Sequence, residues 1–128
     1  MRYIIDGYNL FFKLEEDILP LKEKRESFIS LLDDKVGNLC LNVTVVFDSH
    51  RENSEDVASQ KRLKNLEVSF SPKNLSADQY ILELLEWNST NTTLVTSDKK
   101  LALLARSKGA KTESIEGFIK FILRRNKR

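Results

Sequence analysis

The sequence predicts an α/β fold with a mostly parallel central sheet and helices on both faces. Short apolar segments rich in β-branched residues alternate with longer segments of helical periodicity, which is the pattern that parallel strands require. Apolar residues make up 41% and charged residues 31% of the 128 residues. This composition is typical of a globular protein that buries one core. We therefore expect a single domain over residues 1–128, with a basic C-terminal tail at 124–128.

The chain begins with a strand and a helix. The predicted strand, Arg2 to Ile5, is short and apolar and ends at Asp6. The helix runs from about Pro20 to Val36, because proline suits a first helical turn and Gly37 can end the helix.

Two further strands flank a long polar segment. The β-branched segment Asn42 to Phe47 predicts a second buried strand, which ends at Asp48. Ser49 to Asn65 has no clear strand pattern and predicts a loop with at most a short helix. Leu66 to Phe70 predicts the third strand.

The second half alternates helices and strands without interruption. Ser76 is the predicted N-cap of a helix that runs to about Trp87. Thr92 to Thr96 predicts a strand, Asp98 to Ser107 a helix, Lys111 to Glu113 a short strand and Ile115 to Arg125 the last helix.

Composition excludes several classes of function. Cys40 is the only cysteine and His50 the only histidine, so neither an intrachain disulfide nor a Cys/His zinc site is available. The sequence has no Gly-rich loop of the type that binds nucleoside triphosphates or dinucleotides. It also has no secretory signal and no apolar run of about 20 residues, so we expect a cytoplasmic protein.

Four aspartates are predicted at one edge of the sheet. Asp6, Asp48 and Asp98 follow strands, and Asp78 lies in the first turn of the helix after the third strand. Each alone is more simply a cap or a strand-ending residue. Together they form a cluster of carboxylates whose repulsion a bound cation would offset. Oxygen ligands without cysteine or histidine favour Mg²⁺ or Mn²⁺, which suits phosphodiester cleavage.

The formal net charge is only +2, so the distribution of basic residues is more informative than their number. Basic side chains near the predicted site or in the tail are candidates for contact with RNA phosphates: Arg51, Lys99, Lys100, Arg124 and Arg125. Ordinary solvated helix surfaces and a solvated tail explain the same residues equally well.

Several motifs, in order along nearly the whole chain, resemble the NYN domain in its YacP-like branch. They are D-G-Y-N at residues 6–9, V-F-D ending at Asp48, S-A-D at residues 76–78 and V-T-S-D ending at Asp98. The resemblance implies a PIN-like three-layer domain with strand order 3-2-1-4-5. It also implies a metal-dependent endoribonuclease that acts on RNA, with the ribosome as a partner in messenger RNA cleavage.

The resemblance also implies roles for individual residues. Asp6, Asp78 and Asp98 match the acids that bind Mg²⁺ or Mn²⁺, and Asn9 matches the polar residue that orients Asp6 or a water. Supporting roles fall to Asp48, to Ser97, which would place Asp98 or a phosphate, and to Ser76.

The chain departs from the family pattern in the helix after Ser76. Gln79 and Leu82 occupy positions where the family has acids. Glu83 points about 140° away from Asp78 on an ideal helix and is an imperfect replacement. We expect either a single tightly held metal ion or reduced activity.

Two other readings remain open. One is an RNA- or ribosome-binding module that keeps the fold but has weak or lost catalytic activity, which the residues Gln79 and Leu82 favour. The other is a receiver-like phosphoacceptor domain. That fold needs two adjacent acids after the first strand, and here Gly7 follows Asp6.

Overall fold

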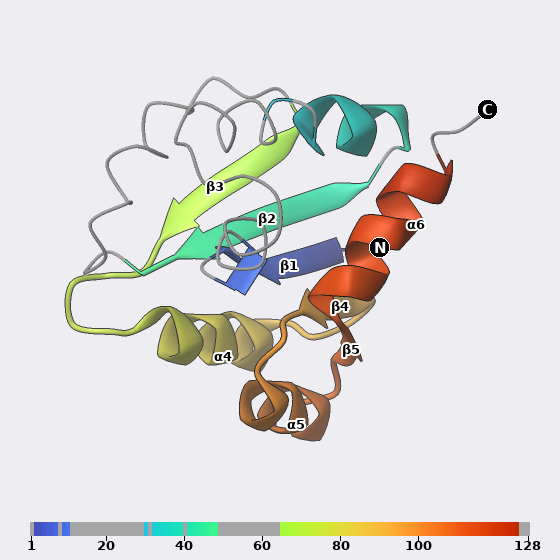
Figure 1. Ribbon diagram of the computed structural model, residues 1–128. Helices are drawn as coiled ribbons and strands as arrows, with labels where there is room; N and C mark the ends of the chain where they lie inside the picture. Colours follow the sequence, from blue (N-terminus) through green and yellow to red (C-terminus); the bar gives the residue numbers. More distant parts are fainter. Residues whose placement is uncertain are drawn as a thin grey trace.

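A computed structural model describes residues 2–7, 9–10, 30, 32–39, 41–48 and 65–125, with the side chains of 122–125 excepted. Within these residues the chain forms a five-stranded sheet with helices on both faces (Figure 1). The predicted strand order 3-2-1-4-5 is confirmed, and all four strand pairings are parallel.

The strands lie close to their predicted positions. They are β1 (Arg2–Asp6), β2 (Asn42–Phe47), β3 (Leu66–Phe70), β4 (Thr92–Val95) and β5 (Lys111–Glu113). β1 is central, and Ile5 is in register with Val45 of β2 and with Val95 of β4. Because the three strands are parallel and in register, their carboxyl ends meet at one edge of the sheet.

The helices of the second half also agree with the sequence. They are α4 (Ala77–Trp87), α5 (Lys99–Ser107) and α6 (Ile115–Arg125). Residues 32–38 are helical, which confirms the C-terminal part of the helix expected from Pro20. The helix includes Gly37 and ends at residue 38, however, so the expected end at Val36 was wrong. Most of the rest of that helix, residues 49–64 of the loop expected from Ser49 to Asn65, and the tail beyond Arg125 lie outside the described residues.

The core consists of two layers, one on each face of the sheet. Neighbouring strand residues point to opposite faces, as strand geometry requires. Ile5 packs with α6 and with helical residues 32–38, whereas Ile4 packs with α4 and α5. Figure 1 shows α4 and α5 at one side of the sheet. In the described part of the chain, no helix has the length and apolar character needed to cross a bilayer.

Candidate active site

Asp6 is the buried centre of a polar cluster at the carboxyl end of β1. Its relative exposure is 3%, so the carboxylate needs partners. The Asn9 side-chain amide donates to Asp6 Oδ2, and the Thr96 hydroxyl donates to the same oxygen over 3.2 Å. Asn9 therefore reaches back to Asp6 from the first turn after the strand, as the sequence predicts.

The backbone after Asp6 is held in place by an aromatic ring. A Cβ added at Gly7 would lie 2.7 Å from Cε1 of Phe47, which is closer than carbon atoms approach without movement. Phe47 is itself buried and packs against Phe70 on β3, with ring centroids 5.9 Å apart. The chain can therefore turn from Asp6 toward Asn9 only because residue 7 has no side chain.

Thr96 connects Asp6 to Asp98 and was not predicted from the sequence. Its Oγ1 accepts hydrogen bonds from the Asp98 backbone N–H over 3.1 Å and from the Asn9 amide over 3.3 Å. It uses its one hydrogen for Asp6. Ser97, which the resemblance placed in a supporting role, is exposed and does not line the cavity described below. A hydroxyl residue directly after a strand and two residues before an acid is the signal that identifies Thr96.

Asp98 is both the N-cap of α5 and a residue of the candidate site. Its Oδ1 accepts from the backbone N–H groups of Lys100 and Leu101, over 2.9 and 3.1 Å. These bonds fix the carboxylate at the start of the helix. Among the described residues, no hydrogen bond to Asp98 Oδ2 is formed.

The start of α4 is fixed by a capping box. The Ser76 hydroxyl accepts from the Gln79 backbone N–H over 3.2 Å, and the Gln79 side chain accepts from the Ser76 N–H over 2.9 Å. The box presents Asp78 in the first turn of the helix. Gln79 is thereby committed to the cap, and neither Gln79 nor Glu83 lines the cavity. Leu82 packs with the α4 side of the core.

These elements surround one cavity of about 310 Å³. The residues that line it come from the ends of β1 and β2, from the start of α4 and from the cap of α5: Asp6, Asn9, Asp48, Ser76, Ala77, Asp78 and Asp98. The structure thus brings together all four predicted aspartates. Lys99 and Lys100 are exposed in the first turn of α5, beside Asp98 but outside the lining. Arg51 and the side chains of Arg124 and Arg125 lie outside the described residues.

Burial and neighbouring carboxylates raise the pKa values of Asp6 and Asp78. Burial raises the pKa of Asp6, the charge of Asp78 raises it further, and the hydrogen bonds from Asn9 and Thr96 lower it. Partial removal from solvent raises the pKa of Asp78, and the charges of Asp98 and Asp48 add to the rise. The cavity therefore carries excess negative charge at neutral pH.

The donor set fits a hard divalent cation. All four acids offer oxygen ligands, and the raised pKa values of Asp6 and Asp78 indicate that positive charge is favoured there. Among the residues that the structure describes, however, no three acidic, histidine or cysteine side chains are already arranged as a metal site. The charge and the chemistry of the lining fit a divalent cation, although the described side chains do not form a completed metal site.

We expect the metal-free protein to gain stability from these aspartates as the pH falls. A carboxyl whose pKa is raised by folding favours the folded state below its ordinary value of 3.8, and that contribution is lost as the pH rises through the raised pKa. In EDTA, an Asp6→Asn/Asp78→Asn variant should be more stable than the native sequence near pH 7.5. The difference in melting temperature should narrow toward about pH 4.5. A difference that does not vary with pH would contradict this assignment.

The fold and the site define a PIN-like nuclease architecture. The model of the YacP-like NYN domain family matches residues 3–128, and the chain belongs to this family. The family is PIN-like and associated with nuclease activity. A search of curated proteins finds no match to the chain.

Two crystal structures of Rae1 (YacP) from Bacillus subtilis are similar to the chain. The structure of the W164L mutant has a TM-score of 0.71 at 24% sequence identity, and the alignment covers 98% of this chain and 77% of the Rae1 chain. A second Rae1 structure has a TM-score of 0.66 at 25% sequence identity, and the alignment covers 98% of this chain and 76% of the Rae1 chain.

Proposed function

We propose that this protein is an endoribonuclease that cleaves RNA phosphodiester bonds with the help of Mg²⁺ or Mn²⁺. The observation that carries the proposal is the convergence of Asp6, Asp48, Asp78 and Asp98 on one cavity in a YacP-like NYN domain. A structural role explains one aspartate at a strand end, but it does not explain four whose charges oppose one another.

The residues divide into ligands and supports. Asp6, Asp78 and Asp98 would hold the metal ion, which when bound supplies a Lewis acid and a nucleophile at neutral pH. Asn9 and Thr96 keep the Asp6 carboxylate facing the cavity through their hydrogen bonds. Asp48 and Ser76 line the cavity and assist the charge balance and the shape of the site.

The substrate contacts come from the start of α5. Lys99 and Lys100 are exposed there, directly after Asp98, and α5 contains no acidic residue. They are placed to attract an RNA phosphate toward the carboxylate edge. Arg51, Arg124 and Arg125 remain predicted RNA contacts from the sequence, and the ribosome remains a predicted partner.

A second candidate function is an RNA-binding module of low activity. The Gln79 side chain is used in the capping box, and Glu83 does not reach the cavity, so no described side chain replaces the acids expected at positions 79 and 82. Fewer ligands reduce the affinity for metal.

A cleavage assay separates the two functions. Labelled single-stranded RNA is incubated with the protein and Mn²⁺ or Mg²⁺, with EDTA as the metal-free reference and Asp98→Asn beside the native sequence. We expect cleavage that requires the metal and is lost in Asp98→Asn, because a neutral amide still caps α5 but ligates a cation poorly. Binding without cleavage, on free RNA and on translating ribosomes, would exclude the nuclease and favour the binding module.

A further inference from the structure

A second cavity, of about 410 Å³, lies at the ends of α4 and α5 that are far from the carboxylates. Both helices begin at the candidate active site, with Asp78 in the first turn of α4 and Asp98 as the cap of α5. The second cavity is lined by the last turn of α4, the loop that follows it and the C-cap of α5; the polar and aromatic side chains are Glu86, Trp87, Asn88, Ser89, Thr90, Ser107 and Lys108. We call it the α4–α5 hollow.

Trp87, at the rim of the hollow, is the most conspicuous of these residues. It is the only tryptophan of the sequence, and its relative exposure is 86%. The buried face of α4 consists of Ala77, Ile81 and Leu85, so the fold does not use the indole. A flat aromatic ring left open beside a polar cavity offers a stacking surface.

The loop beside Trp87 is rigid but keeps hydrogen-bonding groups available. The Arg2 guanidinium donates to the Asn88 carbonyl over 2.7 Å, and the Asn88 side chain accepts from the Thr90 N–H over 3.0 Å. These bonds hold the backbone. The hydroxyls of Ser89 and Thr90, in contrast, form no hydrogen bond with any described residue, so they can bind a ligand without breaking a contact.

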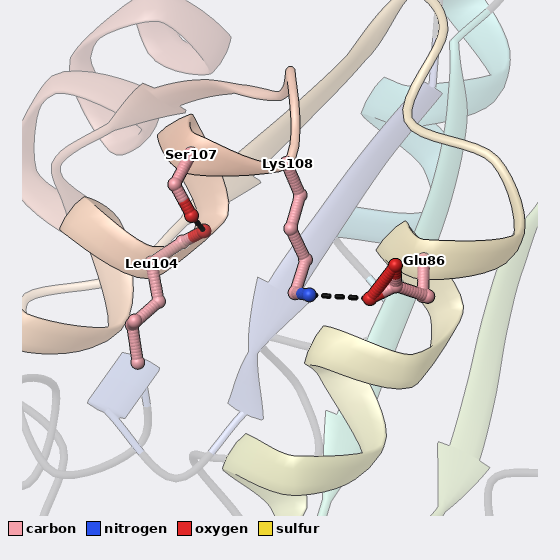
Figure 2. A network of polar contacts seen from close by, with 4 residues as sticks. All are labelled: Glu86, Leu104, Ser107 and Lys108. Atoms are coloured by element: carbon pink, nitrogen blue, oxygen red, sulfur yellow. Dashed lines mark hydrogen bonds and ion pairs between the residues drawn. The ribbon is translucent and has the colours of Figure 1, made fainter.

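Among the described residues that line the hollow, Lys108 is the one cation. Lys108 pairs with Glu86 across the gap between α5 and α4 (Figure 2). The Glu86 side chain is 69% exposed and that of Lys108 27%, and an ion pair open to solvent on one side contributes little to stability. Lys108 can therefore exchange Glu86 for a phosphate at small cost.

An exposed stripe on α5 joins the two cavities. α5 carries no acid; its Lys99 and Lys100 lie beside the candidate active site, whereas Arg106 lies off the stripe and donates to the Thr112 hydroxyl of β5 over 2.7 Å. Lys100, Leu104 and Ser107 are spaced as one face of a helix and are all exposed, and Ser107 is already in the hollow. The ten steps along the chain from Asp98 to Lys108 correspond to about 15 Å along the helix. α4, which carries the exposed Glu83 and Glu86, forms the acidic wall on the other side.

We propose that single-stranded RNA lies along this stripe of α5, from the carboxylate cavity to the α4–α5 hollow, where one unpaired base stacks on Trp87. The inference rests on the proposed function for its choice of RNA. The lining supports that choice, because hydroxyl and amide groups beside an aromatic ring and a lysine suit a nucleotide, whereas the apolar anchor of a protein partner needs apolar walls.

The sole tryptophan makes the test direct. The full chain is titrated in EDTA, where the metal-dependent cleavage is suppressed, with a single-stranded RNA of about ten nucleotides. Two signals are followed: the emission of Trp87 and the anisotropy of a labelled copy of the RNA. We expect the RNA to quench Trp87 over the same concentration range in which the anisotropy rises. Trp87→Ala should weaken binding about five-fold or more, and Trp87→Phe should retain most of the affinity.

Two variants control for unspecific effects. Lys120→Ala removes an exposed cation from α6, which packs on the opposite face of the sheet, and should bind as the native sequence does. Glu86→Gln releases Lys108 and should tighten binding at low salt, with a steeper dependence on salt concentration.

The outcomes separate this inference from the nuclease. If the anisotropy saturates without quenching, or if Trp87→Ala binds RNA normally, the stacking site is overturned while the nuclease is untouched. Quenching in EDTA, combined with no cleavage when Mn²⁺ or Mg²⁺ is supplied in the separate cleavage assay, supports the stacking site and counts against the nuclease. If Trp87 emission shifts with protein concentration in the absence of RNA, the indole is a protein contact and the inference is wrong.

Discussion

Asp6→Asn should lower the rate of RNA cleavage by about a thousand-fold or more. The substitution keeps the volume of the side chain and one oxygen for the hydrogen bonds from Asn9 and Thr96. It removes the charge of the most buried of the four carboxylates, which is a ligand of the proposed cation. The same change should stabilise the metal-free protein by a few degrees, because burial and Asp78 disfavour the charged form of Asp6.

A loss of cleavage together with a gain in stability would show that the charge of Asp6 serves function and does not stabilise the fold. Cleavage is measured at saturating Mn²⁺, and melting temperature is measured in EDTA and again with Mn²⁺. The native sequence should gain stability from the ion, and Asp6→Asn should gain much less. Asp34→Asn, an exposed aspartate of helical residues 32–38, is the matched control and should change neither quantity. Full activity in Asp6→Asn would remove this residue from the site.

Asp33→Ala should destabilise the fold by about 2–4 kcal/mol without touching the candidate site. Asp33 is 6% exposed, and its Oδ1 accepts from the backbone N–H groups of Asn65 and Leu66, over 2.8 and 2.7 Å. It thereby ties helical residues 32–38 to the start of β3. Alanine leaves two N–H donors at this place without their acceptor, and the donor of Leu66 is buried.

Urea unfolding measures the free energy of unfolding of Asp33→Ala. The melting temperature of this variant should fall by about 10 °C. Asp33→Asn keeps an acceptor oxygen and should lie between alanine and the native sequence. Asp34→Ala, next to it and exposed, should change stability little. If Asp33→Ala loses no more free energy of unfolding than Asp34→Ala does, the hydrogen bonds from Asn65 and Leu66 to Asp33 do not stabilise the start of β3.

The fold could be predicted because its signals are local. The limits of β2, β3 and β5 agree with the sequence because runs such as NVTVVF have a period and a composition that only strands satisfy. β4 ends at Val95, and Thr96, directly after it, uses its side chain to bond with Asp6 and with the backbone of Asp98. A side-chain network of this kind has no signature in periodicity.

The candidate site could be predicted only in outline. Parallel topology places the residues after β1, β2 and β4 at one edge, and this was enough to expect Asp6, Asp48 and Asp98 together. The tie between Asp33 and the start of β3 depends on a contact between residues 32 positions apart, which sequence spacing does not reveal. The exposure of Trp87 could not be predicted either, because an apolar residue at the end of an apolar helix is expected to be buried.

The close approach of Phe47 to Gly7 makes residue 7 dependent on the opposite half of the sheet. The ring that leaves no room for a Cβ is itself held by Phe70 on the edge strand β3. Substitutions at positions 7, 47 and 70 are therefore not independent, and a side chain at position 7 is compatible only with a smaller residue at position 47. The position of the Asp6 carboxylate therefore depends on the packing of Phe47 against Phe70, two strands away. A redesign of strand β3 must preserve this packing to keep Asp6 in place.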